Sequence, residues 1–145
     1  MKKFFYLMSL CLCMFAGAAV MTSCGDDDLD DIDPDDIEIK AGITEKGNTL
    51  TVSFSNGFYT YQEIATFDSN DKCIKYVEKE IYPNKETANQ AWDAYKAEYK
   101  DKPEEMAKYS KDGKTITHDA TEKYKGASKA EIRRNMEEML EHSHY

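Results

Sequence analysis

The chain has 145 residues, with 28 acidic and 19 basic side chains and a formal net charge of −9. Nine acids lie within residues 26–38, and two bases, Lys2 and Lys3, lie within the first 23 residues. That leaves 19 acids and 17 bases from residue 39 onward. This near-neutral remainder lacks the basic surface that phosphate binding needs, which argues against nucleic acid as a ligand. It is long enough for one domain with one core.

Residues 1–23 have the features of a secretory signal peptide. Lys2 and Lys3 supply a positive start, residues 4–15 an apolar run, and Ser23 a small residue before the expected cut. An uncleaved transmembrane helix is the alternative, because about 18 apolar residues are the lower limit for spanning a bilayer. We predict cleavage before Cys24.

The segment Val20-Met21-Thr22-Ser23-Cys24 resembles the lipobox of bacterial lipoproteins. The resemblance implies that Cys24 becomes the N-terminal residue and carries a thioether-linked diacylglycerol and an N-acyl chain such as palmitate. Two or more acyl chains anchor a protein stably in a membrane. The membrane is then a partner through this lipid, and no cofactor other than the covalent lipid is expected.

The acidic segment after the cysteine begins with Asp26, Asp27 and Asp28. It resembles the export signal that sends lipoproteins of Bacteroidota to the outer face of the outer membrane; a periplasm-facing protein is the other possibility. Like charges at this density repel one another, so residues 24–38 are predicted to form a flexible linker. Clustered carboxylates also suit calcium, but the run lacks the ligand spacing and turn glycine of a calcium loop. We therefore predict no metal site.

Three strands are predicted next. Residues 48–54 alternate between apolar and polar side chains, which indicates a half-buried strand. A turn at Asn56-Gly57 leads to a second strand at residues 58–67, rich in aromatic and β-branched residues. A third strand is predicted at residues 72–82. Short connections make these three strands an antiparallel meander.

A helix is predicted at residues 85–100, because Asn84 can cap its start and apolar residues then recur at helical spacing: Ala88, Trp92, Tyr95 and Tyr99.

Residues 106–111 and 114–119 resemble a hairpin around Asp112-Gly113. Ser128 and Glu131 form a capping box before a last helix. One face of that helix carries Ile132, Met136, Met139 and Leu140. Together, these strands and helices predict a single α+β domain at residues 39–145, with an antiparallel sheet of about five strands and two helices on one face.

Few residues suggest catalysis. Cys73 with His118 could form a thiol nucleophile and its base, but a buried structural thiol is the preferred interpretation. His118 with Asp119 could form a base and its orienting carboxylate, and we interpret that pair as a strand-end hydrogen bond. His142 and His144 lie two apart, which points them in different directions on a helix. No catalytic residue is assigned.

Tyrosines are the remaining candidates for a binding site. Tyr59 and Tyr61 share one face of the second predicted strand, and Tyr76 and Tyr82 share one face of the third. These rings either form a patch for a glycan or a protein surface, or fill a small core. We predict a non-catalytic, membrane-anchored surface lipoprotein that acts as a small binding module. The alternatives are an inhibitor or immunity lipoprotein that blocks a secreted enzyme, and a small hydrolase that uses His118.

Overall fold

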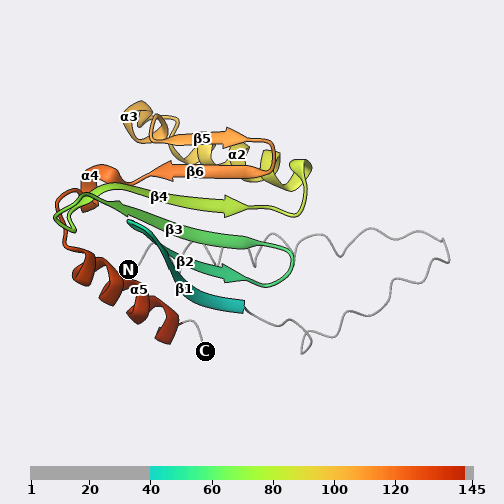
Figure 1. The fold of residues 1–145 in the computed structure, drawn as a ribbon. Coiled ribbons are helices and arrows are strands. Elements are labelled where there is room, and N and C mark those ends of the chain that lie inside the picture. The colour runs from blue at the N-terminus through green and yellow to red at the C-terminus, as the bar shows by residue number, and fades with distance from the viewer. Residues whose placement is uncertain (1–39, 143–145) are drawn as a thin grey trace, which may run out of the picture. The chain divides into compact units, whose positions relative to one another are not determined.

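The structure is a computed structural model that describes residues 40–142 (Figure 1). The predicted signal peptide, the lipidation site Cys24 and the acidic residues Asp26, Asp27 and Asp28 lie outside these residues. Six strands form one sheet in the order β1-β2-β3-β4-β6-β5, and every neighbouring pair is antiparallel. The strands are β1 (Lys40–Lys46), β2 (Thr49–Ser55), β3 (Thr60–Phe67), β4 (Cys73–Ile81), β5 (Tyr109–Asp112) and β6 (Thr115–Asp119). The helices are α2 (Lys85–Glu98), α3 (Pro103–Met106), α4 (Thr121–Tyr124) and α5 (Lys129–His142).

Strands β2, β3 and β4 confirm the predicted meander. β1 was missed in the sequence, because all but two of its seven side chains are exposed and it shows little alternation. It pairs with β2 across a two-residue connection in which Gly47 has a positive φ of 61°. Glycine reaches this backbone conformation without a steric penalty. The sheet therefore has six strands where about five were expected.

The predicted hairpin is confirmed as β5 and β6, and β6 pairs with β4. Its first strand begins later than expected, because residues 103–106 form the short helix α3. Pro103 stands in the first turn of α3, where its fixed φ suits a helix and its missing N–H costs nothing. Met106 therefore belongs to a helix and not to a strand.

Both longer helices pack against the same face of the sheet, as predicted. Lys129 and Arg133 of α5 pair with Glu45, which lies opposite Leu50 in the sheet. Tyr95 of α2 donates a hydrogen bond to Glu80, which the strand register places on the same face as Leu50. In Figure 1, α5 runs beside β1 and β2, and α2 lies beside β5 and β6. This face holds the core, including the fully buried Leu50, Val52, Ala65 and Phe67.

Helix α2 begins as predicted, since Asn84 Oδ1 accepts a hydrogen bond from the Thr87 amide at 2.9 Å. Its predicted apolar stripe is divided in the structure: Ala88 and Tyr95 are buried in the core, and Trp92 and Tyr99 are half-buried. Trp92, which a wholly buried apolar stripe would place in the core, is therefore only partly buried.

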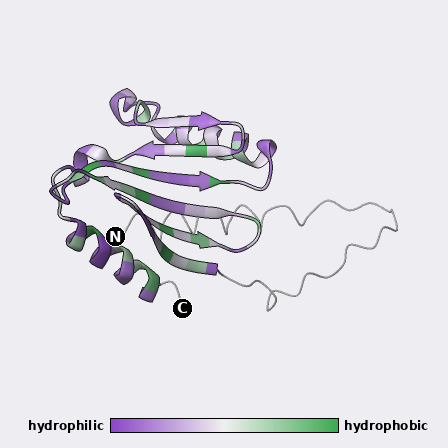
Figure 2. Ribbon diagram, viewed as in Figure 1, coloured by the Kyte–Doolittle hydropathy of each residue, from purple (hydrophilic) through white to green (hydrophobic). Residues whose placement is uncertain are grey.

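Helix α5 is amphipathic, and Figure 2 shows hydrophobic and hydrophilic stretches alternating along it. The Ser128 hydroxyl accepts a hydrogen bond from the Glu131 amide at 3.3 Å, as the capping box predicts. Ile132 and Met136 are buried, whereas Met139 and Leu140 are half-buried. None of the helices within residues 40–142 has the length and apolarity needed to cross a bilayer.

Replacing Met136 with Ala is expected to lower the free energy of unfolding by about 2–5 kcal/mol, because the side chain is fully buried and its removal leaves a cavity. Urea denaturation followed by circular dichroism measures the loss. Met139→Ala on the same helix is the control, and its half-buried side chain predicts a smaller effect. Equal losses for the two variants would contradict the packing of α5 described above.

Candidate functional site

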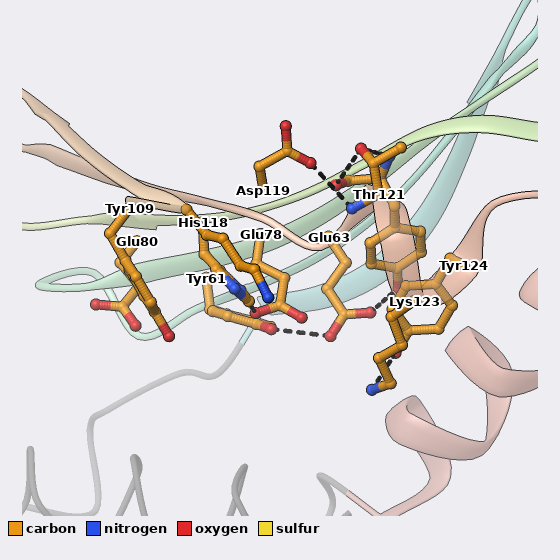
Figure 3. Close-up of polar contacts among 12 residues, drawn as sticks. Tyr61, Glu63, Glu78, Glu80, Tyr109, His118, Asp119, Thr121, Lys123 and Tyr124 are labelled. Atoms are coloured by element: carbon orange, nitrogen blue, oxygen red, sulfur yellow. Dashed lines mark hydrogen bonds and ion pairs between the residues drawn. The ribbon is translucent and has the colours of Figure 1, made fainter. Parts of the chain in front are cut away.

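Ionisable side chains form a row across the packed face of the sheet. The register of four neighbouring strands aligns Glu63 of β3, Glu78 of β4, His118 of β6 and Tyr109 of β5. Glu80 lies two residues from Glu78 and on the same face. Figure 3 shows these side chains on one side of the strands. Carboxylates at the centre of a core face need compensating partners, because burying an unpaired charge is costly.

Glu63 is held by two tyrosines. Its side chain is only 6% exposed, and the Tyr61 hydroxyl donates to Oε1 at 2.8 Å while the Tyr76 hydroxyl donates to Oε2. Burial raises the pKa of Glu63, and the two phenol hydrogen bonds oppose that rise. The side chain thus has two donors aimed at it in a water-poor environment.

Glu80 repeats this arrangement with a second pair of tyrosines. The Tyr95 hydroxyl of α2 donates to Oε1 at 2.6 Å, and the Tyr82 hydroxyl donates to Oε2. Glu80 is also 6% exposed, and burial raises its pKa despite both hydrogen bonds. Because Tyr95 comes from α2 and Glu80 from β4, this contact ties the helix to the sheet.

The tyrosine hydroxyls remain donors at physiological pH. Burial and the neighbouring glutamates raise the pKa of Tyr61, Tyr76 and Tyr95 above the ordinary value of a phenol. Within residues 40–142, every buried side-chain nitrogen and oxygen has a hydrogen-bond partner. The two glutamates and their tyrosines therefore form satisfied polar networks inside the core.

The tyrosines expected as a possible ligand patch are mostly interior. Tyr61, Tyr76 and Tyr82 are between 2% and 9% exposed, so their rings pack in the core and their hydroxyls bind the two glutamates. Tyr59 is half-buried, and its ring lies edge-on to that of Tyr82 at 5.4 Å between centroids. The second interpretation from the sequence, tyrosines filling a small core, describes these four positions better than a solvent-facing platform.

His118 pairs with Glu78 and not with Asp119. Its Nδ1 lies 2.9 Å from Glu78 Oε2, and its ring stacks on Tyr109 at 4.4 Å between centroids. Asp119 points to the other side of the strand (Figure 3) and accepts a hydrogen bond from the Thr121 amide at 2.9 Å. The predicted His118–Asp119 bond was wrong, because adjacent residues of a strand face opposite sides.

Cys73 is buried, as preferred from the sequence. Its thiol lies 3.4 Å from the Lys75 carbonyl oxygen, and burial raises its pKa, which disfavours the reactive thiolate. His142 lies at the end of α5 with Nδ1 2.6 Å from the Glu138 carbonyl oxygen, and His144 falls outside the described residues. No group of three or more His, Cys, Asp or Glu side chains that could hold a metal occurs in the described part of the chain.

An open groove of about 420 Å³ lies between α2, α3 and β5. Its lining residues are Trp92, Lys96, Tyr99, Lys100, Pro103, Met106, Ala107 and Tyr109. The rings of Tyr99 and Tyr109 stack at 5.3 Å between centroids, and their hydroxyls lie 3.4 Å apart. Three aromatic rings, a proline and a methionine therefore surround a space that a ligand can enter.

The groove was not predicted from the sequence, although part of the signal was present. Trp92 and Tyr99 lie seven residues apart and so share one side of α2. Tyr109 joins them only through the position of β5 at the edge of the sheet. Large apolar side chains left half-buried at such a place are typical of binding surfaces.

We compared the chain with protein-family models, with curated proteins and with solved structures, and none of the three comparisons found a match.

Proposed function

We propose that this protein is a non-catalytic, membrane-anchored binding module of the outer membrane, and that the groove between α2, α3 and β5 contacts its ligand. One observation carries the proposal: Trp92, Tyr99 and Tyr109 are gathered at the surface around a single depression. The lipid on Cys24 would anchor the domain in the membrane, and the acidic residues that follow would direct its export to the cell surface.

The composition of the groove supports binding. The groove is open to solvent, and its lining is mainly apolar with a few polar groups, as at ligand-binding surfaces. Tryptophan and tyrosine dominate the energetically important positions of interfaces, because they bury a large area and carry a polar tip. An anchored domain also gains effective concentration against ligands at the same surface.

The geometry supports catalysis less well. His118 and Glu78 form a partly exposed pair, with 23% and 26% of their side-chain surface accessible. Neither residue belongs to the lining of the groove. The two buried carboxylates on the same face, Glu63 and Glu80, already accept hydrogen bonds from tyrosines, so they are held in the core.

The proposal is tested with the mature chain, residues 24–145, made soluble by Cys24→Ala. The protein is immobilised and screened against cell-envelope glycans, host glycans and secreted proteins. Trp92→Ala is expected to weaken any specific binding by about 2 kcal/mol, or roughly thirtyfold, as for the central residue of an interface. Phe58→Ala is the matched control, because Phe58 is an aromatic residue 48% exposed outside the groove.

Thermal unfolding of both variants separates lost binding from lost folding. Specific binding that survives Trp92→Ala in a folded protein would show that the groove is not the ligand surface. Tight capture of a secreted enzyme with loss of its activity would favour the inhibitor alternative.

A further inference from the structure

The groove carries positive charge in a chain that is acidic overall. Lys96 and Lys100 are two of its eight lining residues, and none of the lining residues is acidic. Lys96 pairs with Asp93 at 2.7 Å, and both side chains are more than half exposed. Lys100 is exposed and forms no ion pair with another residue of the range 40–142. An anionic ligand group would therefore find one ammonium without competition and one held by a weak surface pair.

We propose that the groove binds an oligosaccharide that bears carboxylate groups, of the uronic acid type. The inference rests on the proposed function and names the ligand class of the same site. A sugar ring lies against Trp92 and meets the edges and hydroxyls of Tyr99 and Tyr109, whose faces stack on each other and on His118. The carboxylates pair with Lys96 and Lys100. Aromatic ring faces suit the C–H faces of sugars, and lysine offers a charge with three rotatable donors.

A glycan fits this groove better than an extended peptide. A peptide that adds to a sheet needs a row of free backbone groups along an edge strand. The edge strand here, β5, is only four residues long and turns at once through Gly113, which has a φ of 57°. The groove offers the ring of Trp92, the hydroxyls of Tyr99 and Tyr109, and two ammonium groups. These groups recognise stacked rings and negative charge.

Trp92 makes the proposal directly measurable, because it is the single tryptophan of the chain and lines the groove. The mature Cys24→Ala protein is titrated with tetragalacturonate, and Trp92 emission is recorded. The matched ligand is the fully methyl-esterified tetragalacturonate, which keeps the sugar rings and removes the charge. We expect saturable binding of the acid, roughly tenfold weaker binding of the ester, and an affinity for the acid that falls as salt rises.

Two lysine variants complete the test. Lys96→Gln with Lys100→Gln is expected to weaken binding of the acid roughly tenfold, without changing the affinity for the ester. Lys46→Gln is the control, because Lys46 is an exposed lysine on β1, at the opposite edge of the sheet. The exposed positions of all three lysines predict that each variant folds normally.

Each other outcome overturns the inference in a recognisable way. Equal affinity for acid and ester would refute the anionic class and leave the groove as a binding site. Tighter binding of polyglutamate than of tetragalacturonate would replace the glycan by an acidic peptide. If neither sugar changed the Trp92 emission, the glycan class would be refuted. The proposed function is a separate question, and it would fail only if Trp92→Ala also left all captured partners bound.

Discussion

Replacing Glu63 with Ala is expected to destabilise the domain by about 2–6 kcal/mol. The substitution leaves the hydroxyls of Tyr61 and Tyr76 buried without their shared acceptor. Each buried donor left unsatisfied costs about 1–3 kcal/mol. Urea unfolding at pH 7 measures the change, with circular dichroism and fluorescence as two probes of a single transition.

Two further variants identify the cause of this loss. Glu63→Gln keeps an acceptor of nearly the same size, so it should recover much of the lost stability. Glu78→Ala removes a glutamate from the same row, but its side chain is 26% exposed, so its effect should be smaller. A Glu63→Ala variant as stable as the parent protein would mean that water or a rearranged side chain satisfies both phenols.

Raising the pH from 5 to 8 is expected to destabilise the domain. The pKa values of Glu63 and Glu80 are raised in the folded state, chiefly by burial, whereas an unfolded glutamate titrates near about 4.3. The folded state therefore binds more protons. The stability that these protons contribute is fully present below the unfolded pKa and is lost as the pH rises through the folded pKa values. The midpoint temperature of thermal unfolding should therefore fall as the pH is raised from 5 to 8.

Other ionisable groups near Glu63 and Glu80 also influence the pKa values of these two glutamates. Glu63 faces Lys123 and Glu78 in addition to its two tyrosines. Glu80 faces Glu78 and His118 in addition to its own tyrosines.

Asp119 and Glu45 have lowered pKa values, owing to hydrogen bonds from Thr121 and Lys129. Their contributions to stability are lost only as the pH falls below about 4, so Asp119 and Glu45 do not change the stability between pH 5 and 8.

A double variant, Glu63→Gln with Glu80→Gln, assigns the effect. It removes both titrations and keeps an acceptor oxygen for each pair of tyrosines, so its unfolding midpoint should change much less between pH 5 and 8. If the double variant followed the pH as steeply as the parent protein, the source would lie elsewhere, and the pair of His118 and Glu78 would be the next to examine.

The elements of this domain were largely predictable because their signals are local. Alternation over residues 48–54 marked β2, and Asn84 and Ser128 marked the starts of α2 and α5. A strand period or a cap depends on interactions within a few residues. β1 lacked such a signal, since an exposed edge strand needs little apolar alternation, and only its pairing with β2 reveals it.

Tyr61, Glu63 and Ala65 occupy alternating positions of the second predicted strand and so share one face, but the sequence did not show that this face is buried. The pair of Glu63 with Tyr76 and the matching pair of Glu80 with Tyr95 became apparent only from the strand register and the docking of α2. The hydrogen bonds join residues 13 and 15 positions apart through space, and no local period encodes such distances.

The amino-acid sequence by itself determined the α+β class, the meander, the capped helices and the resemblance of residues 20–28 to a lipoprotein export signal. The tertiary structure alone decided which polar side chains from different strands and helices meet, and which aromatic rings remain at the surface. Trp92 and Tyr109 show why: Trp92 lies on helix α2, and Tyr109 lies on β5, an edge strand of the sheet. Their meeting depends on long-range packing, which sums many weak contacts across the whole core.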